Sequence, residues 1–345
     1  MPKARALGLL SGGLDSTLAA RLLMEQGIEV ACVNFYTGFC VQNHTQAIRA
    51  KEGDPAPRHD ALHAAEVLGI KLHIVDISEE YVRIVTDPKY GYGKNLNPCL
   101  DCKIFMVEKA WELKEKLGFD FLFTGEVVGQ RPMSQRADTM PKVARESGVE
   151  GWLVRPLCAK RLPETEPEKQ GLVDREKLMG FHGRSRKPQM ALAAEFGLVD
   201  YPSPAGGCCF LTDENYSRRL QDLWDNRGSK QYSMEDIILL KAGRHLRISP
   251  TCKIIVGRDE PENNFLQGFR AGRWAIRAAN LPGPLALVEG APSTEDLEAA
   301  CRLTARFGKG KSHPSVAISV EHDGQTETRE VAPFGADEVP QSWYL

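Results

Sequence analysis

The sequence predicts an α/β protein with a doubly wound parallel sheet in its N-terminal part and a smaller α+β domain after it. Between about residues 6 and 124, short apolar segments alternate with amphipathic ones, as in parallel sheets whose strands are joined by helices. A glycine-rich turn, SGGLDS at 11–16, separates the first apolar segment from the first helical one. After residue 229 strands predominate, which indicates a separate small domain.

The individual elements follow from apolar periodicity and from the residues that flank each segment. In the N-terminal part we expect strands at 7–10, 29–35, 71–76 and 119–124, with helices at 16–25, 60–68 and 102–116. A basic, proline-containing stretch then holds shorter helices at 174–179 and 187–196. In the C-terminal part we expect strands at 252–256, 273–279, 285–289, 315–320 and 327–331, with helices at 263–269 and 294–307.

Composition narrows the class of protein. The chain has 345 residues, enough for two or three domains, and 42% hydrophobic and 26% charged residues, as in ordinary soluble proteins. No apolar run reaches membrane-spanning length, and the first residues do not resemble a signal peptide, so we expect a cytoplasmic protein without a membrane partner. In that compartment the nine cysteines are expected to be ligands, nucleophiles or buried residues. The net charge of −2 does not by itself indicate nucleic-acid binding.

The SGGLDS turn suits a phosphate ligand. Gly12 and Gly13 allow backbone conformations closed to other residues, and the following helix presents unpaired amides at its first turn. Ser11 and Ser16 add hydroxyl donors, and Asp15 is compatible with phosphate if it acts through bound Mg²⁺. Neither a dinucleotide fingerprint nor a Walker A motif is present. A plain glycine turn with a serine cap is the alternative.

The turn resembles the pyrophosphate loop (PP-loop) of the adenine nucleotide α-hydrolases. The resemblance implies that ATP is cleaved between its α and β phosphates, that a carbonyl oxygen is adenylated, and that a nucleophile displaces AMP. It also implies a catalytic role for Asp15. The expected ATP-binding residues are Ser11, Gly12, Gly13, Leu14, Asp15, Ser16, Phe35 and Gly125. Phe35 ends one strand of the expected sheet and Gly125 follows another, at the edge where ligands of such sheets bind.

Two cysteine-containing segments form the next motif. Cys99 and Cys102 lie in PCLDCK, which runs into a helix, and a C-x-x-C loop there can hold a metal, form a redox pair or lower a thiol pKa. A single C-x-x-C cannot complete a metal site. The segment GGCC at 206–209 offers further thiols, and buried small residues are the alternative for Cys208 and Cys209.

Together these segments resemble the tRNA thiouridine synthetases of the 4-thiouridine or 2-thiouridine type. The resemblance implies a [4Fe-4S] cluster on Cys99, Cys102 and Cys208, all three also catalytic, with Cys209 as the alternative third ligand. The fourth iron would be open to hydrosulfide. A persulfide on Cys99 or Cys102 is the alternative without a cluster. The other cysteines, Cys32, Cys40, Cys158, Cys252 and Cys301, are expected to pack in the interior, although Cys40 follows a strand at the nucleotide edge.

A loop at 125–136 resembles the second loop of these synthetases, beside the nucleotide and the target base. Gln130, Arg131 and Ser134 offer donors there, but only Gly125 is assigned to the site.

Residues 241–250 and 253–263 resemble the NFACT RNA-binding domain, over roughly 230–345. Arg244, Arg247 and Lys253, with His245 and Arg258, are expected to align on one face and bind RNA phosphates. A solvated basic face is the alternative. The expected domains are 1–205, including a basic extension at 130–205, a Cys-bearing segment and linker at 206–229, and the RNA-binding domain at 230–345.

The expected function is ATP-dependent thiolation of a tRNA uridine, with release of AMP and pyrophosphate. Its partners would be tRNA and a sulfur donor, either hydrosulfide or a persulfide-carrying protein. A free nucleobase or cofactor precursor as substrate is one alternative, and a nucleotide-dependent RNA-binding factor without sulfur chemistry is another. The sequence leaves the oligomeric state and the modified base open.

Overall fold

The computed structural model describes residues 3–41, 48, 58–202 and 209–345. Their contacts divide the chain between Cys209 and Phe210 into two compact units. The first holds residues 3–41, 58–202 and Cys209, and the second holds Ile48 and Phe210–Leu345.

The first unit is built on a five-stranded sheet in the order β3-β2-β1-β4-β5, with every pair of neighbours parallel. The strands are β1 (Arg5–Leu9), β2 (Glu29–Tyr36), β3 (Lys71–Asp76), β4 (Phe121–Thr124) and β5 (Leu153–Val154). Because β1 lies between β2 and β4, the connections leave it on opposite sides and the chain direction switches there. The turn after β1 is therefore at the position where such sheets bind ligands.

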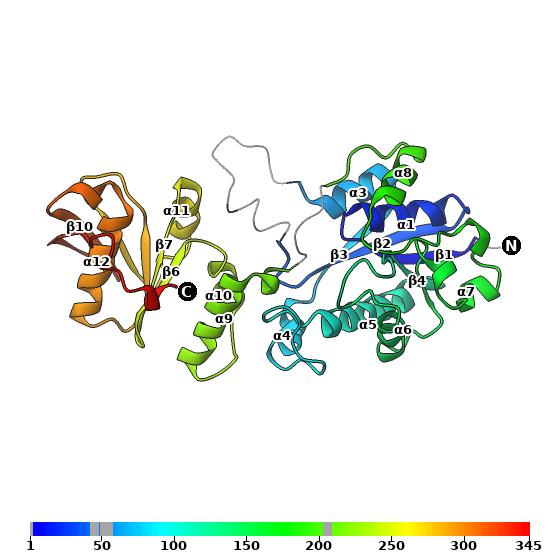
Figure 1. Ribbon diagram of the computed structural model, residues 1–345, viewed down its shortest axis with the longest axis horizontal. Coiled ribbons are helices and arrows are strands. Elements are labelled where there is room, and N and C mark those ends of the chain that lie inside the picture. The colour runs from blue at the N-terminus through cyan, green and yellow to red at the C-terminus, as the bar shows by residue number, and fades with distance from the viewer. Residues whose placement is uncertain (1–2, 42–47, 49–57, 203–208) are drawn as a thin grey trace. The chain divides into compact units, whose positions relative to one another are not determined.

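Helices cover both faces of this sheet (Figure 1). One layer holds α1 (Leu14–Met24), α3 (Asp60–Leu68) and α8 (Lys187–Glu195), and the other holds α4 (Ser78–Thr86), α5 (Cys99–Leu117) and α6 (Thr139–Glu146). The four residues of β4 are all buried, as expected of a strand covered on both sides. Gly8 in β1 makes room for Phe123 of β4, since a Cβ there would lie 2.1 Å from the ring.

The second unit holds a six-stranded antiparallel sheet in the order β11-β10-β8-β9-β7-β6. The strands are β6 (Arg244–Ser249), β7 (Cys252–Val256), β8 (Trp274–Ala278), β9 (Ala286–Gly290), β10 (Val316–His322) and β11 (Gln325–Val331). The helices are α9 (Glu214–Arg227), α10 (Met234–Leu239), α11 (Glu260–Gln267) and α12 (Thr294–Phe307). Helix α12 packs on one sheet face against the largest apolar cluster of this unit.

The predicted fold class is confirmed, and several elements, such as 60–68, 71–76, 252–256 and 294–307, have the expected bounds. Other predictions were wrong. The expected helix at 174–179 is only a 3₁₀ turn at Arg175–Lys177, closed by the Asp174 carboxylate. Strand β6 was missed because its sequence RHLRIS has an arginine on each face, of which Arg247 pairs with Asp222 of α9. Helix α9 occupies most of the range 206–229, where we expected a linker, and it belongs to the second unit.

Candidate active site

The turn after β1 is preformed for an anion. Gly12 has φ +80°, and a Cβ there would lie 2.3 Å from the Asp60 backbone, so only glycine fits. The Ser16 hydroxyl donates to the Gly13 carbonyl at 2.9 Å, which holds the turn closed. Within the described residues, no side chain caps the first turn of α1. A helix N-terminus without a side-chain cap among the described residues offers its first amides to an anion, as in phosphate-binding turns.

Asp15 is the charged group of this turn. The Gln130 amide donates to its Oδ2 at 2.8 Å, whereas Oδ1 is buried and has no hydrogen-bond partner in the described part of the chain. Burial raises the pKa of Asp15, against the opposing effects of Gln130 and of the positive Arg186 and Arg131. A buried carboxylate oxygen without a donor fits a divalent cation, because Mg²⁺ binds through one or two carboxylates and substrate phosphates.

Four residues around Asp15 were not assigned from the sequence. Gln130 and Arg131 lie in the loop at 125–136, and Arg186 and Gln189 lie at the start of α8. Gln189 is fully buried near Asp15, yet neither polar atom of its amide makes a well-formed hydrogen bond within the described residues. The sequence did contain a signal for Gln189, because this polar residue shares its helix face with the buried Leu192 and Ala193. An amide on an apolar face indicates a ligand or partner for that amide.

Two of the residues that were expected to bind ATP are buried apolar side chains. Leu14 is 2% exposed and Phe35 is 7% exposed, and both pack within the first unit. Their side chains support the sheet edge beside the turn, so any side-chain contact they make with a nucleotide is apolar.

Gly125 brings the second loop against the PP-loop. A Cβ at Gly125 would lie 2.5 Å from the backbone carbonyl carbon of Asp15 and 2.5 Å from the backbone nitrogen of Ser16. Real Cβ atoms do not approach backbone this closely, so any larger residue would push the loop at 125–136 away from the turn.

We therefore expect Gly125→Ala to destabilise the protein by about 1–3 kcal/mol, as for overpacked sites, and to weaken ATP binding. The physical reason is displacement of the Asp15 backbone. Thermal unfolding and nucleotide titration measure the two effects. Gly180→Ala is the control, because the nearest atom to its Cβ would be 3.4 Å away and its φ is not positive. Normal ATP affinity in Gly125→Ala would contradict the proposed contact.

A buried ion pair links this loop to the cysteine-bearing helix. Glu126 is 3% exposed, and its carboxylate lies 3.2 Å from Arg155 and 3.5 Å from Lys103, the residue after Cys102 in α5. The Thr124 hydroxyl also donates to it at 2.9 Å. Burial opposes the charge, but the two cations and the hydroxyl outweigh it and hold the pKa of Glu126 below its usual value. The first turn of α5 is thereby fixed beside the nucleotide loop.

Thiols from three segments face Tyr81 of α4. Cys99 and Cys102 lie in the first turn of α5, both half-buried, and Cys102 hydrogen-bonds with the fully buried Tyr81 hydroxyl. The pKa of Tyr81 is raised well above its usual value by burial first, and then by the neighbouring Cys102, Cys209 and Cys40. From the sequence, Cys40 was expected to pack in the interior, although it follows a strand at the nucleotide edge.

The structure describes two of the three cysteines expected to hold the cluster, Cys99 and Cys102. Cys208 lies outside the described residues. Among the residues that the structure does describe, no group of three His, Cys, Asp or Glu side chains is arranged to hold a metal ion. Cys99, Cys102 and Cys209 therefore do not form a metal site as they lie, and the cluster assignment depends on Cys208.

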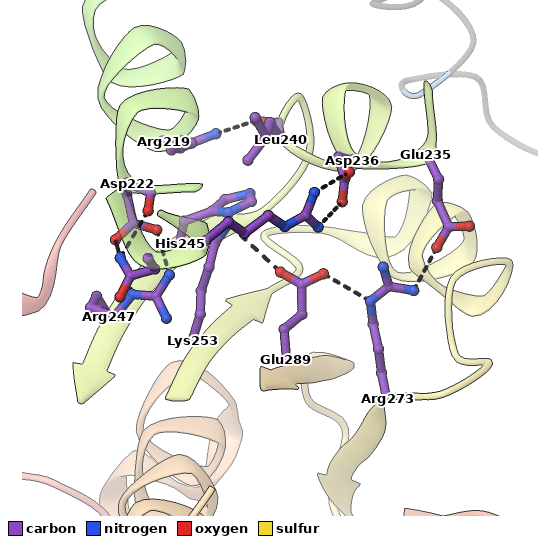
Figure 2. A network of polar contacts seen from close by, with 12 residues as sticks. Arg219, Asp222, Glu235, Asp236, Leu240, His245, Arg247, Lys253, Arg273 and Glu289 are labelled. Carbon is purple, nitrogen blue, oxygen red and sulfur yellow. Dashed lines mark hydrogen bonds and ion pairs between the residues drawn. The ribbon is translucent and has the colours of Figure 1, made fainter. Parts of the chain in front are cut away.

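The residues expected to bind RNA lie on two faces of the second sheet. Arg247 pairs in register with Lys253, and both point toward α9 and α10 into a buried polar network (Figure 2). Arg247 binds Asp222 with two hydrogen bonds of 2.9 and 2.6 Å. The Lys253 side chain is 3% exposed and lies 3.7 Å from Glu289. In this structure both cations are engaged inside the protein.

His245 belongs to the same network (Figure 2). Its Nε2 lies 2.8 Å from the Ala242 carbonyl, and burial, followed by the charges of Arg219 and Lys253, holds its pKa well below the usual value. It is neutral and adds no positive charge. Arg244 alternates to the opposite face, where its guanidinium lies 5.1 Å from the centre of the Phe307 ring of α12. The expected single basic face is therefore not formed by this set of residues.

Comparison with protein families matches both units. Residues 4–145 match the tRNA methyl transferase HUP domain, and residues 243–344 match the NFACT protein RNA binding domain. The chain combines a PP-loop HUP domain with an NFACT RNA-binding domain. The resemblances to the PP-loop family and to the NFACT RNA-binding domain are thereby confirmed.

Curated relatives of the HUP domain are tRNA-specific 2-thiouridylases. The chain is 28% identical over 229 residues to that of Symbiobacterium thermophilum, which covers 63% of this chain and 55% of the relative. The match therefore spans little more than half of that protein. The relative from Geobacter metallireducens is 26% identical, over 95% of this chain and 90% of its own length.

Among solved structures, a 4-thiouridine synthetase–RNA complex with bound ATP has 22% identity and a TM-score of 0.33, over 50% of this chain and 40% of that chain. A likeness of this size transfers no residue roles. In the described portion of the chain, the helices are too short or too polar to cross a membrane.

Proposed function

We propose that this protein is an ATP-dependent tRNA sulfurtransferase that thiolates a uridine. The observation that carries the proposal is Asp15, with one buried oxygen unpartnered within the described residues, in a turn whose helix amides are open. The ion pair between Lys103 and Glu126 supports it, because it holds the cysteine-bearing helix beside the same loop. The relatives named as 2-thiouridylases support tRNA as the substrate.

The proposed reaction begins with activation of the uridine. The phosphates of ATP lie against the amides at the start of α1, and Arg131 and Arg186 stabilise the negative charge that develops as pyrophosphate leaves. Mg²⁺ held by Asp15 would neutralise the phosphates. The uridine carbonyl oxygen attacks the α phosphate and becomes adenylated. A sulfur nucleophile then attacks the activated carbon, and AMP leaves with the oxygen.

We propose that the sulfur nucleophile is held by the cysteines at the start of α5. We propose Cys99, Cys102 and Cys208 as the ligands of a [4Fe-4S] cluster, which would supply an open iron that binds hydrosulfide. The alternative without a cluster is a persulfide on Cys99 or Cys102, and the contact between Cys102 and Tyr81 is compatible with it. A soluble, cytoplasmic enzyme is proposed in both cases.

The test combines two measurements. Mass spectrometry of tRNA nucleosides from cells with and without the gene should show one thiouridine that depends on it. Anaerobically purified protein should contain iron and sulfide in equal amounts and release AMP only with tRNA. Unchanged nucleosides together with AMP release on a free base would favour the small-molecule alternative. RNA binding without AMP release would favour the factor without sulfur chemistry.

For the RNA-binding domain we expect Arg244→Glu to weaken tRNA binding several-fold and to reduce its salt dependence by about one counterion. Of the three cations expected to bind RNA, Arg244 lies on the face opposite the buried network. Arg302→Glu is the control, because Arg302 also lies over a ring, that of Phe334, and carries the same charge. Binding measured across a salt series distinguishes them, and equal effects of the two variants would show that only net charge matters.

Arg247→Glu is expected to act through stability. It would place a second carboxylate against Asp222 and remove two hydrogen bonds, at a cost of about 3–5 kcal/mol for a broken buried pair. Thermal unfolding measures this cost.

A further inference from the structure

Cys40 and Cys209 are backbone neighbours. They form an antiparallel β-bridge, although they lie 169 positions apart in the sequence. Directly opposite residues of an antiparallel pair have Cα atoms about 4.5–5.5 Å apart. Disulfides join residues whose Cα atoms are about 4.4–6.8 Å apart. The bridge therefore places the two cysteines at a separation that a disulfide spans without movement of the backbone.

The two side chains also share a neighbour. Both cysteines are partly exposed, and both raise the pKa of the buried Tyr81 hydroxyl. The Cys40 Sγ lies 3.5 Å from the Thr37 hydroxyl, which can donate a hydrogen bond to a thiolate. A disulfide between the two sulfurs is neutral and places no charge beside the buried phenol.

We propose that Cys40 and Cys209 form a reversible disulfide, a redox site that joins the segment after β2 to the cysteine-bearing segment. The oxidant is a low-molecular-weight disulfide of the glutathione class. One cysteine thiolate attacks it, forms a mixed disulfide and releases one thiolate. The other cysteine then attacks the protein sulfur of that mixed disulfide and releases the second thiolate. Two electrons pass from the protein thiols to the small disulfide, and excess thiol reverses the reaction.

The pairing also bears on the tandem cysteines. If Cys209 pairs with Cys40, Cys208 is the thiol left for the proposed cluster, a consequence that rests on the proposed function. The disulfide itself does not, because it forms without ATP, tRNA or iron.

The full-length, iron-free protein is equilibrated with mixtures of reduced and oxidised glutathione, quenched with acid, alkylated and mapped by mass spectrometry. A cross-linked peptide joining Cys40 to the 208–209 pair should rise with the oxidised fraction and disappear on treatment with dithiothreitol. Because Cys208 and Cys209 share a peptide, variants assign the bond. Cys208→Ser should retain the cross-link, and Cys40→Ser and Cys209→Ser should abolish it.

Cys158→Ser is the matched control, because burial raises the pKa of Cys158 to about 11 and the thiol is inaccessible. It should retain the cross-link. Near-equal melting temperatures of the reduced variants show that each folds. The proposal is overturned if the cross-link joins Cys102 to the 208–209 pair, if it survives in Cys209→Ser, or if Cys40 only becomes glutathionylated. If the cross-link forms as expected but tRNA thiolation is the same with and without the gene, the result counts against the proposed function alone.

Discussion

Asp15→Asn is expected to lower AMP release by at least about a hundredfold, the size of effect seen when one preorganised charged contact to the reacting group is removed. The amide keeps the shape of the carboxylate but cannot ligate Mg²⁺ through a charged oxygen. The Gln130 donor would then face an amide, so part of the loss reflects a disturbed contact. Single-turnover assays of AMP formation with tRNA and ATP measure the effect.

The same variant is expected to fold as well as the parent protein, or better. The pKa of Asp15 is raised by burial, so its charge is less favourable in the folded than in the unfolded chain. Above the unfolded pKa this charge destabilises the fold, and the cost is relieved as pH falls through the folded pKa. Asparagine removes that cost at neutral pH. Thermal unfolding therefore separates lost catalysis from lost structure.

Asp138→Asn is the control, because Asp138 is exposed. Within the described residues, its ion-pair partner is the nearby Arg136. It should leave AMP release unchanged. Near-normal AMP formation in Asp15→Asn would refute the assignment of the turn as a PP-loop. In the parent, AMP formation at sub-saturating ATP and Mg²⁺, which reports the free enzyme, should fall on acidification at a higher pH than for an ordinary carboxyl, because burial raises the pKa of Asp15.

Replacing Cys99, Cys102 or Cys208 by Ala is expected to remove most of the iron from anaerobically purified protein and to abolish thiolation. Each replacement removes one thiolate from a site with three protein ligands, so none can be spared. ATP binding should survive, because the nucleotide contacts lie on the turn after β1. Iron and sulfide analysis, thiouridine mass spectrometry and nucleotide titration measure the three properties.

Cys209→Ala is the matched control for this series. If Cys208 is the third ligand, Cys209→Ala retains iron, and the reverse outcome moves the ligand by one residue. A persulfide mechanism predicts that the parent lacks iron and that Cys208→Ala has a smaller effect than replacement of Cys99 or Cys102. Stoichiometric zinc without iron would exclude the cluster and leave the thiolates as a structural site.

Local patterns were sufficient for most elements of the fold. The alternation of apolar strands and amphipathic helices predicted the parallel sheet, and glycine ends such as Gly69 and Gly118, both with positive φ, mark where α3 and α5 end. The turn at 11–16 could be assigned because its chemistry lies in consecutive residues. Strand β6 and helix α9 could not be predicted in this way, because Arg247 of β6 pairs with Asp222 of α9 across a buried face.

The fold class, the PP-loop and the resemblance of the C-terminal part to an RNA-binding domain could be predicted from the sequence, because each depends on residues that are close together in the chain. Only the tertiary structure placed Gln189 at Asp15, enclosed Arg247 and Lys253 in a polar network, and paired Cys40 with Cys209. Such contacts join residues far apart in the chain, and whether a cation faces solvent or a carboxylate depends on which helix covers its strand. That information is absent from local periodicity and arises when the sheets and helices pack.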